Sequence, residues 1–176
     1  MAFDNFFYTY PSPIGDLFIT TTHNALKELR FNKPPLYFQC SEETQPFKET
    51  KTWLDIYFEG KTPTFVPPIT IEGTAFQKEV WAIVANIPYG KTLSYGDIAK
   101  IIALKRNIKR MSSQAVGQGV GANPIAIIIP CHRVLGAKKE LTGYAGGLDK
   151  KIFLLSLEKI SFSLKTSTGQ GPSLNA

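Results

Sequence analysis

The sequence has few of the residues that build disulfide or metal scaffolds. Its 176 residues include 2 cysteines, Cys40 and Cys131, and 2 histidines, His23 and His132. Two distant cysteines form no disulfide framework, and Cys40 with His23 supplies too few ligands for zinc, so we expect no metal site. A free thiol persists in a reducing compartment, which favours a cytoplasmic protein.

Long apolar runs are also missing. The longest, Ile125 to Ile129, is far too short to cross a bilayer. Met1 to Asn5 carries no basic segment followed by an apolar one. We therefore expect neither a membrane span nor a signal peptide. The hydrophobic fraction of 43% is still enough to bury a core in one large domain or two small ones.

Acidic residues are outnumbered by basic ones, 14 to 20, which gives a net charge of +6. An excess of Lys and Arg raises affinity for phosphate backbones. The basic residues concentrate between two predicted helices, where no acid lies between Lys100 and Arg110. This cluster is equally compatible with a nucleic-acid contact and with a solvated loop.

Turn residues divide the chain into two domains and a tail. Strand-like segments separated by turn residues lie at Phe6 to Tyr10, Asp16 to Thr22 and Leu26 to Phe31. A helix is predicted at about Gln45 to Glu59, where apolar residues that include Tyr57 can share one face. The segment from Lys61 to Gly73 contains three prolines, which disfavour helices and central strands, so we predict that it is a linker. We assign 1–72 to a small α/β domain with its linker, 73–163 to a second, mostly helical domain, and 164–176 to a disordered tail.

The second domain has the layout of a helix-turn-helix. Helices are predicted at Ala75 to Ile87, from the Ser94-Tyr95-Gly96-Asp97 capping box, from Ser112 or Ser113, and at about Asp149 to Glu158. The third of these contains Gly117, Gly119 and Gly121, each costing about 1 kcal/mol relative to alanine. Such glycines allow close approach either to a DNA groove or to a neighbouring helix.

The segment Ile129-Pro130-Cys131-His132-Arg133 carries the strongest chemical signal. An apolar run predicts a buried strand that fixes a thiol at its end, and the adjacent base and cation can favour the nucleophilic thiolate. The alternative is a buried cysteine that only fills space. Neighbours in a strand point to opposite faces, so His132 reaches Cys131 only where the chain turns or a water bridges them.

Together these residues resemble the O6-alkylguanine-DNA alkyltransferases, also called methylated-DNA–protein-cysteine methyltransferases. The resemblance covers Thr74 to about Glu158 and lies in Ile87-Pro88-Tyr89-Gly90-Lys91-Thr92-Leu93-Ser94-Tyr95, Ala115-Val116-Gly117, Asn123-Pro124, Pro130-Cys131-His132-Arg133-Val134 and Gly143-Tyr144-Ala145-Gly146-Gly147-Leu148. It implies an α/β protein with a small N-terminal α/β domain and a mostly α, winged-helix-like helix-turn-helix domain. The implied partner is duplex DNA carrying O6-alkylguanine, bound in the minor groove by a monomer without a cofactor.

The resemblance also implies the chemistry. A flipped base would lose its alkyl group irreversibly to Cys131, once per molecule, with O4-alkylthymine left open as a second substrate. His132 would deprotonate the thiol through a water, and Glu158 would orient His132. Asn123 would support the turn at the site, and Tyr95 would position the nucleotide and protonate the leaving oxygen.

Two further sets of residues follow from the resemblance. The base pocket would comprise Tyr144, Val134 and Ala145, and the DNA-binding residues would be Arg110, Ser113, Gln114, Ala115, Gly117 and Arg133. One departure stands out, since many members carry an arginine at the position of Gln114. Glutamine lacks the planar cation that fills the gap left by a flipped base, so Gln114 replaces it or Arg110 contributes instead.

Three other functions fit parts of the pattern. A non-catalytic lesion binder of the same fold would lack the acceptor cysteine, which is present as Cys131. A helix-turn-helix regulator leaves the Pro130 to Arg133 motif unexplained. A cysteine hydrolase would turn over repeatedly and needs neither the glycine-rich helix nor the basic connection. Stoichiometry separates them, because a repair acceptor gains one alkyl group and a binder gains none.

Overall fold

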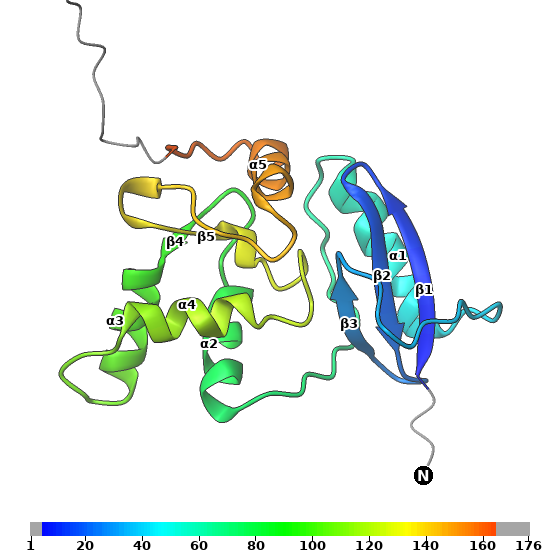
Figure 1. Ribbon diagram of the computed structural model, residues 1–176, viewed down its shortest axis with the longest axis horizontal. Coiled ribbons are helices and arrows are strands. Elements are labelled where there is room, and N and C mark those ends of the chain that lie inside the picture. Colours follow the sequence, from blue (N-terminus) through cyan, green and yellow to red (C-terminus); the bar gives the residue numbers. More distant parts are fainter. Residues whose placement is uncertain (1–4, 165–176) are drawn as a thin grey trace, which may run out of the picture.

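The N-terminal part forms a small antiparallel sheet covered by one helix (Figure 1). The strands β1 (Phe6–Ser12), β2 (Gly15–Thr21) and β3 (Leu26–Arg30) pair in the order β1-β2-β3, and α1 (Gln45–Phe58) packs on one face. Gly15, at φ +100°, lets β1 turn tightly into β2. The computed structural model describes residues 5–164, so all of the predicted tail except Leu164 lies outside it.

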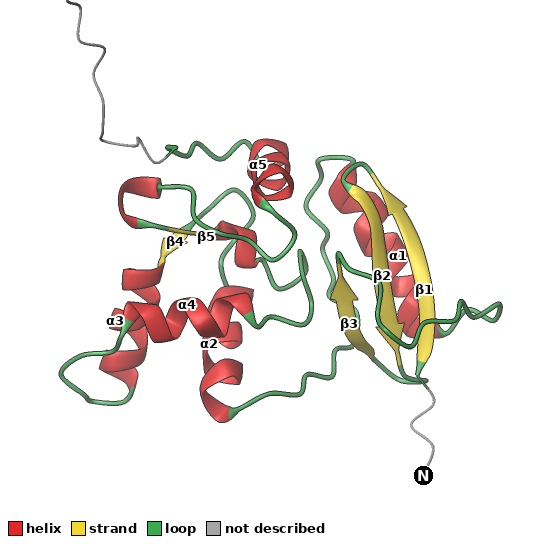
Figure 2. Ribbon diagram, in the orientation of Figure 1, coloured by secondary structure: helices red, strands yellow, loops and turns green. Residues whose placement is uncertain are grey.

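The C-terminal part is mostly helical (Figure 2). Its elements are α2 (Ala75–Ala85), β4 (Leu93–Ser94), α3 (Tyr95–Lys105), α4 (Ser113–Gly121), β5 (Val134–Leu135) and α5 (Leu148–Leu157), with short 3₁₀ helices at Cys131–Arg133 and Ala137–Lys139. Capping boxes at Thr74 and Ser94 begin α2 and α3, because each hydroxyl accepts from the backbone three residues on. The structure therefore has a small N-terminal sheet and a mostly helical C-terminal part. This mixed α/β architecture confirms the predicted fold class.

Close packing explains one of the three glycines in α4. A Cβ on Gly119 would lie 3.2 Å from Cγ2 of Val80 in α2, and its carbonyl accepts a 2.8 Å hydrogen bond from Nε1 of Trp81. Gly119 therefore lets α2 and α4 approach. A Cβ on Gly121 would meet no described atom within 4 Å, and one on Gly117 would lie 3.7 Å from the Tyr95 ring. These two glycines face the cavity described below.

The apolar run before the cysteine is not the predicted strand. Only Ile125 pairs as a strand residue, in an isolated bridge with Leu29 of β3. The chain then turns through Ile127, which has φ +70°, and continues into the 3₁₀ helix that begins at Cys131. A short, fully buried apolar run has no periodicity that distinguishes a strand from a buried turn. Tertiary packing decides the conformation here.

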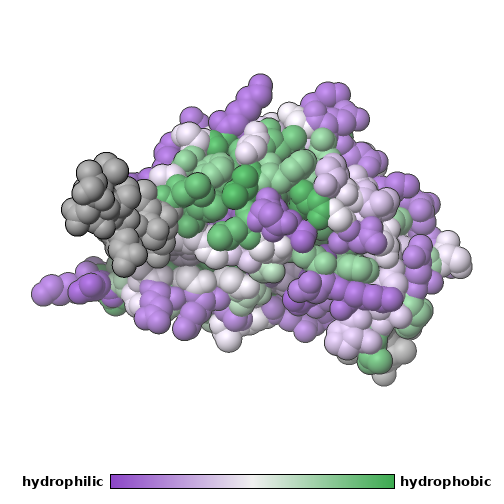
Figure 3. All heavy atoms as spheres, turned by 45° about the horizontal axis from the view of Figure 1, so that its top comes forward, coloured by the Kyte–Doolittle hydropathy of each residue, from purple (hydrophilic) through white to green (hydrophobic). Residues whose placement is uncertain are grey.

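One hydrophobic core joins the two parts. It includes residues from the sheet, from α1, from α2 to α4 and from the turn before the cysteine, such as Leu17, Leu29, Tyr57, Val80, Ile102 and Ile125. Within residues 5–164, no helix has the length and apolarity to cross a membrane. Figure 3, turned so that the top of Figure 1 comes forward, shows apolar side chains gathered on this face of the molecule. The exposed large apolar residues include Leu148 and Phe153 of α5.

Candidate active site

A cavity of about 350 Å³ lies beside α4 and brings together residues from distant parts of the chain. Its walls are Phe31, Tyr95, Gly117, Val120, Gly121, Asn123, Ala126, Cys131, Gly143, Tyr144 and Ala145. The predicted residues Tyr95, Asn123, Tyr144 and Ala145 thus meet Cys131 at one cavity. The sequence did not predict Phe31 as a cavity residue, because it follows β3 in the N-terminal part of the chain and no local motif marks it.

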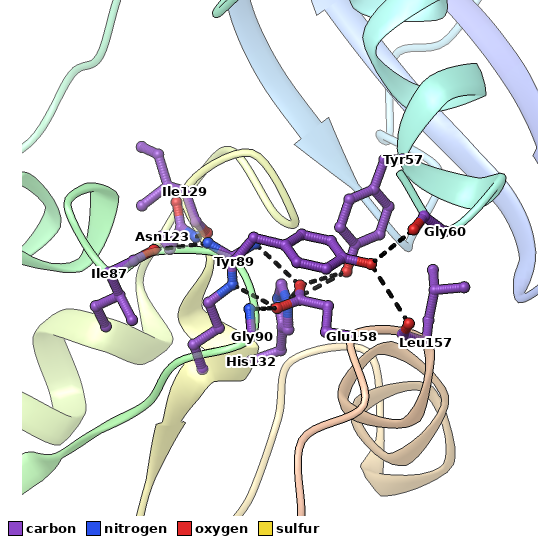
Figure 4. Close-up of polar contacts among 11 residues, drawn as sticks. Tyr57, Gly60, Ile87, Tyr89, Gly90, Asn123, Ile129, His132, Leu157 and Glu158 are labelled. Atoms are coloured by element: carbon purple, nitrogen blue, oxygen red, sulfur yellow. Dashed lines mark hydrogen bonds and ion pairs between the residues drawn. The ribbon is translucent and has the colours of Figure 1, made fainter. Parts of the chain in front are cut away.

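Asn123 holds the thiol of Cys131 in place. Its Nδ2 donates to Sγ of Cys131 at 3.2 Å and to the carbonyl of Ile129 at 2.8 Å, while its Oδ1 accepts from the Ile125 amide at 2.9 Å. One side chain after the end of α4 therefore fixes the turn and the sulfur together. Figure 4 shows the contact of Asn123 with Ile129.

Burial raises the pKa of the Cys131 thiol above its ordinary value. Four groups oppose that effect: the amide of Asn123, the hydroxyl of Tyr144, the positive charge of Lys151 and the backbone amide of Cys131 itself. Arg133 is not one of them, contrary to the expectation that the adjacent cation favours the thiolate. The buried thiol therefore needs a base to become a nucleophile.

His132, the next residue in the chain, lies in a buried polar network. The imidazole is fully buried, and Nε2 lies 2.6 Å from Oε1 of Glu158 and 3.3 Å from the hydroxyl of Tyr57 (Figure 4). The single Tyr57 proton is donated to Glu158 at 2.7 Å, so the tyrosine oxygen can only accept at Nε2. Nε2 must then carry the hydrogen, and Nδ1 is the basic nitrogen. Burial lowers the pKa of His132, which keeps the ring neutral.

Arg133 is part of the same buried network. Its Nε donates to Oε2 of Glu158 at 2.8 Å, Nη2 to Oε1 at 3.0 Å, and Nη1 to the carbonyl of Ile87 at 2.7 Å. Only 7% of the residue is exposed, so the prediction that Arg133 binds DNA is wrong. Burial would raise the pKa of Glu158, but hydrogen bonds from His132 and Arg133 outweigh it and lower the value to about 2.

Thr142 and Lys151 form a hydrogen-bonded chain to the cavity residue Tyr95, and the sequence did not point to either. The hydroxyl groups of Tyr95 and Thr142 share a 2.9 Å hydrogen bond, and fully buried Lys151 donates from Nζ to Thr142 at 3.3 Å. Lys151 also donates to the carbonyl of Val134 at 2.8 Å, and burial lowers its pKa to about 8. Val134, predicted in the base pocket, does not line the cavity.

Tyr144 forms a wall of the cavity with Phe31. The two rings meet edge to face, 5.4 Å apart at 65°. Burial raises the pKa of Tyr144, and proximity to Cys131 adds to the effect, although the hydroxyl makes no hydrogen bond of standard geometry within residues 5–164. A Cβ on Gly146 would lie 2.7 Å from the Phe31 ring, so this glycine lets the loop close on the N-terminal part.

The predicted DNA-binding residues lie at the start of α4. Ser113 and Gln114 are exposed there, Ala115 and Gly117 are partly buried, and Arg110 is exposed just before the helix. Further basic residues are exposed on α3, at Lys100 and Lys105, and in the connection that follows it, at Lys109. Arg106 differs, because its Nε donates to Glu79 at 2.9 Å. The exposed polar start of α4 thus follows a basic connection, and the same helix carries the cavity residue Gly117.

Comparison with known families gives two matches that together span most of the chain. A family model described as 6-O-methylguanine DNA methyltransferase, DNA binding domain, matches residues 75–160. A model of the 6-O-methylguanine DNA methyltransferase, ribonuclease-like domain, matches residues 5–71.

Individual relatives are similar over nearly their whole length. A methylated-DNA–protein-cysteine methyltransferase of Methanosarcina acetivorans is 42% identical, covering 87% of this chain and 97% of the relative. The methylated-DNA–protein-cysteine methyltransferase of Haemophilus influenzae is 38% identical, covering 94% of this chain and 93% of the relative. The crystal structure of Mycobacterium tuberculosis OGT in complex with DNA is 40% identical, with a TM-score of 0.75 over 87% of this chain and 92% of that one.

Proposed function

The chain belongs to the 6-O-methylguanine DNA methyltransferase family, and from that membership we propose that Cys131 takes the alkyl group from O6-alkylguanine in duplex DNA. The relatives are methylated-DNA–protein-cysteine methyltransferases, and this protein likewise repairs DNA by transferring an alkyl group to a cysteine. The observation that carries the residue assignment is the position of Cys131. Its sulfur stands at the cavity wall, hydrogen-bonded by Asn123 and next to a histidine whose basic nitrogen is free of the carboxylate.

The reaction begins with a guanine turned out of the duplex into the cavity, with Tyr144 and Phe31 as its apolar walls. The thiol proton moves through a water to Nδ1 of His132. The Cys131 sulfur then attacks the alkyl carbon in line with the C–O6 bond, so that an S–C bond forms as the C–O6 bond breaks. Glu158 stabilises the imidazolium formed on His132, because its carboxylate accepts from Nε2.

Tyr95 serves the leaving group. Burial raises the pKa of its hydroxyl, which therefore remains protonated until negative charge develops on the guanine. Its present partner is the Thr142 hydroxyl, and a bound base would compete for that hydrogen bond. Tyr95 gives its proton to the guanine as the C–O6 bond breaks, and the thiol proton held on His132 returns through solvent to restore the Tyr95 hydroxyl. Guanine leaves neutral, and the thioether remains on Cys131.

The exposed start of α4 is the proposed DNA contact. Ser113 and Gln114 would enter the minor groove, with Arg110 and the basic connection against the phosphates. Gly117 lies both on this helix and at the cavity wall, so a base displaced beside α4 has a short path to Cys131. The protein would act as a monomer, in the cytoplasm, without a metal or other cofactor.

A time course with a limiting amount of protein tests this function. Duplex DNA carrying O6-methylguanine should lose one methyl group per protein molecule, and the reaction should then stop. Continued release of methyl groups would identify a hydrolytic enzyme. Tight binding to the lesion without methyl loss would identify a lesion-binding protein.

A further inference from the structure

We propose that Tyr57 of α1 is a positioning residue of the His132–Glu158 pair, so that the N-terminal part of the chain completes the active site. This inference rests on the proposed function, in which His132 accepts the thiol proton. It concerns a residue that the sequence marked only as part of an apolar helix face. The role lies in the tyrosine hydroxyl rather than in its ring.

The hydroxyl of Tyr57 contacts both members of the pair. It donates to Oε1 of Glu158 at 2.7 Å and lies 3.3 Å from Nε2 of His132. The same Oε1 accepts from His132 at 2.6 Å and from Arg133 at 3.0 Å. All three donors therefore meet at one carboxylate oxygen, and Tyr57 is the donor that comes from the N-terminal part (Figure 4).

The other carboxylate oxygen is equally constrained. Oε2 of Glu158 accepts from Nε of Arg133 at 2.8 Å and from the Gly90 amide at 3.1 Å. Charge-assisted hydrogen bonds of this kind are short and directional. Removing the Tyr57 donor leaves Oε1 with two partners and lets the carboxylate rotate toward Arg133. Such a rotation would move the acceptor away from the His132 ring.

The Tyr57 ring is held so that the hydroxyl cannot move away. It stacks on Trp53 at 5.3 Å and 12°, and meets Phe58 at 5.5 Å and Tyr89 at 6.1 Å edge to face. Tyr89 in turn contacts the carbonyl of Gly60 at 3.3 Å and that of Leu157 at 3.4 Å. The end of α1 is thus fixed against the end of α5, directly before Glu158 (Figure 4).

A packing role alone does not account for the hydroxyl. Tyr57 has no exposed surface, and a buried hydroxyl is costly unless it is hydrogen-bonded. Phenylalanine would fill the same ring position without that cost. The hydroxyl also restricts the imidazole, because its oxygen can only accept from a hydrogen on Nε2. Tyr57 therefore favours the tautomer that leaves Nδ1 free to accept the thiol proton.

The test is Tyr57→Phe, which keeps the ring and removes the hydroxyl. The single-turnover rate of methyl transfer at saturating DNA should fall about tenfold, the size expected for one hydrogen bond to a charged group. The dissociation constant for the duplex should stay unchanged, because α1 is remote from α4. The matched control is Tyr10→Phe, since Tyr10 donates to Asp55 at 2.6 Å away from the cavity. It should react at the wild-type rate.

A double-mutant cycle distinguishes positioning from general stability. If Tyr57 acts through Glu158, Tyr57→Phe should cause no further loss of rate in a Glu158→Gln background. The cycle is repeated with His132→Gln, which keeps the buried ion pair of Arg133 and Glu158. A wild-type rate for Tyr57→Phe, or losses that multiply in either double variant, would overturn the inference.

The nitrogen resonances of His132 provide a readout that does not need transfer activity. In Tyr57→Phe the Nε2 resonance should shift, whereas in Tyr10→Phe it should stay in place. An unchanged Nε2 resonance in Tyr57→Phe would overturn the positioning role even in an active protein. Failure of the wild-type chain to take up methyl would contradict the proposed function instead, and the two failures are therefore separable.

Discussion

The side-chain amide of Asn123 donates to the sulfur of Cys131 at 3.2 Å, while its oxygen holds the amide of Ile125 at 2.9 Å. One residue thereby connects the end of α4, which carries the proposed DNA contact, to the proposed nucleophile. The amide also opposes the effect of burial on the pKa of the thiol. A change at Asn123 should therefore affect reactivity more than it affects DNA binding.

We predict that Asn123→Asp slows methyl transfer by at least about tenfold, because it removes a donor to sulfur and places a negative charge beside the forming thiolate. Single-turnover kinetics at saturating DNA measure this rate. Asn86→Asp is the control, since Asn86 is exposed after α2 and its side-chain amide donates to the Ala82 carbonyl, away from the thiol. Equal rates for the wild type and Asn123→Asp would show that the hydrogen bond to sulfur has no kinetic role.

The second prediction concerns stability in acid. The pKa of Glu158 is lowered from 4.5 to about 2 in the folded chain, so its ionised form is stabilised relative to the unfolded chain. This contribution is fully present above about pH 4.5 and disappears as pH falls toward 2. Because each pKa unit corresponds to about 1.4 kcal/mol, the stabilisation of the folded chain is on the order of 3 kcal/mol.

This pH dependence is checked by measuring the free energy of unfolding in denaturant for the wild type and for Glu158→Gln, between about pH 6 and pH 2. The variant should be less stable near neutral pH, and the difference should shrink as the solution becomes more acidic. Glu59→Gln is the control, because Glu59 pairs with Lys61 at the exposed surface. A difference between wild type and Glu158→Gln that stays constant with pH would refute the assignment.

The third prediction concerns salt. Lys109→Ala and Arg110→Ala should each weaken DNA binding, and each should reduce the slope of log affinity against log salt by about 1 if the side chain neutralises one phosphate. Fluorescence anisotropy with an unmodified duplex at several salt concentrations gives the slopes. Lys48→Ala, on the exposed side of α1, should leave the slope unchanged. Slopes equal to that of the wild type would place the basic connection away from DNA.

The fourth prediction separates the glycines of α4. Gly119→Ala should destabilise the chain, because the new Cβ would lie 3.2 Å from Val80 in a packed interface. Gly121→Ala should increase the free energy of unfolding by up to about 1 kcal/mol, since alanine favours a helix and its Cβ meets no described atom within 4 Å. Thermal and denaturant unfolding measure both. Equal effects of the two substitutions would contradict the packing explanation.

The sequence predicted those features that depend on local chemistry. The capping boxes, the turns and the apolar faces of the helices are short-range patterns, and α1 to α5 lie where those patterns indicated. The family motifs placed Tyr95, Asn123 and Tyr144 around Cys131, and these three residues do line its cavity. Their proposed roles in the reaction stay predictions.

The features that were missed depend on contacts between distant residues. Phe31 and Tyr57 reach the site from the N-terminal part, and no pattern near either one reveals a partner so far along the chain. Lys151 lies on α5 and looks like an exposed charge until the fold buries it. Arg133 was assigned to DNA because position alone does not say which way a side chain points, and the turn at Cys131 directs it to Glu158.

The central claim is that Cys131 accepts an alkyl group from O6-alkylguanine. Intact-protein mass spectrometry after incubation with a duplex containing O6-methylguanine tests it most directly. The account predicts that each molecule gains one methyl group, that the group maps to the Cys131 peptide, and that Cys131→Ala gains none while still binding the duplex. A wild-type protein that binds the lesion duplex and gains no methyl group, or a Cys131→Ala variant that still gains one, would contradict it.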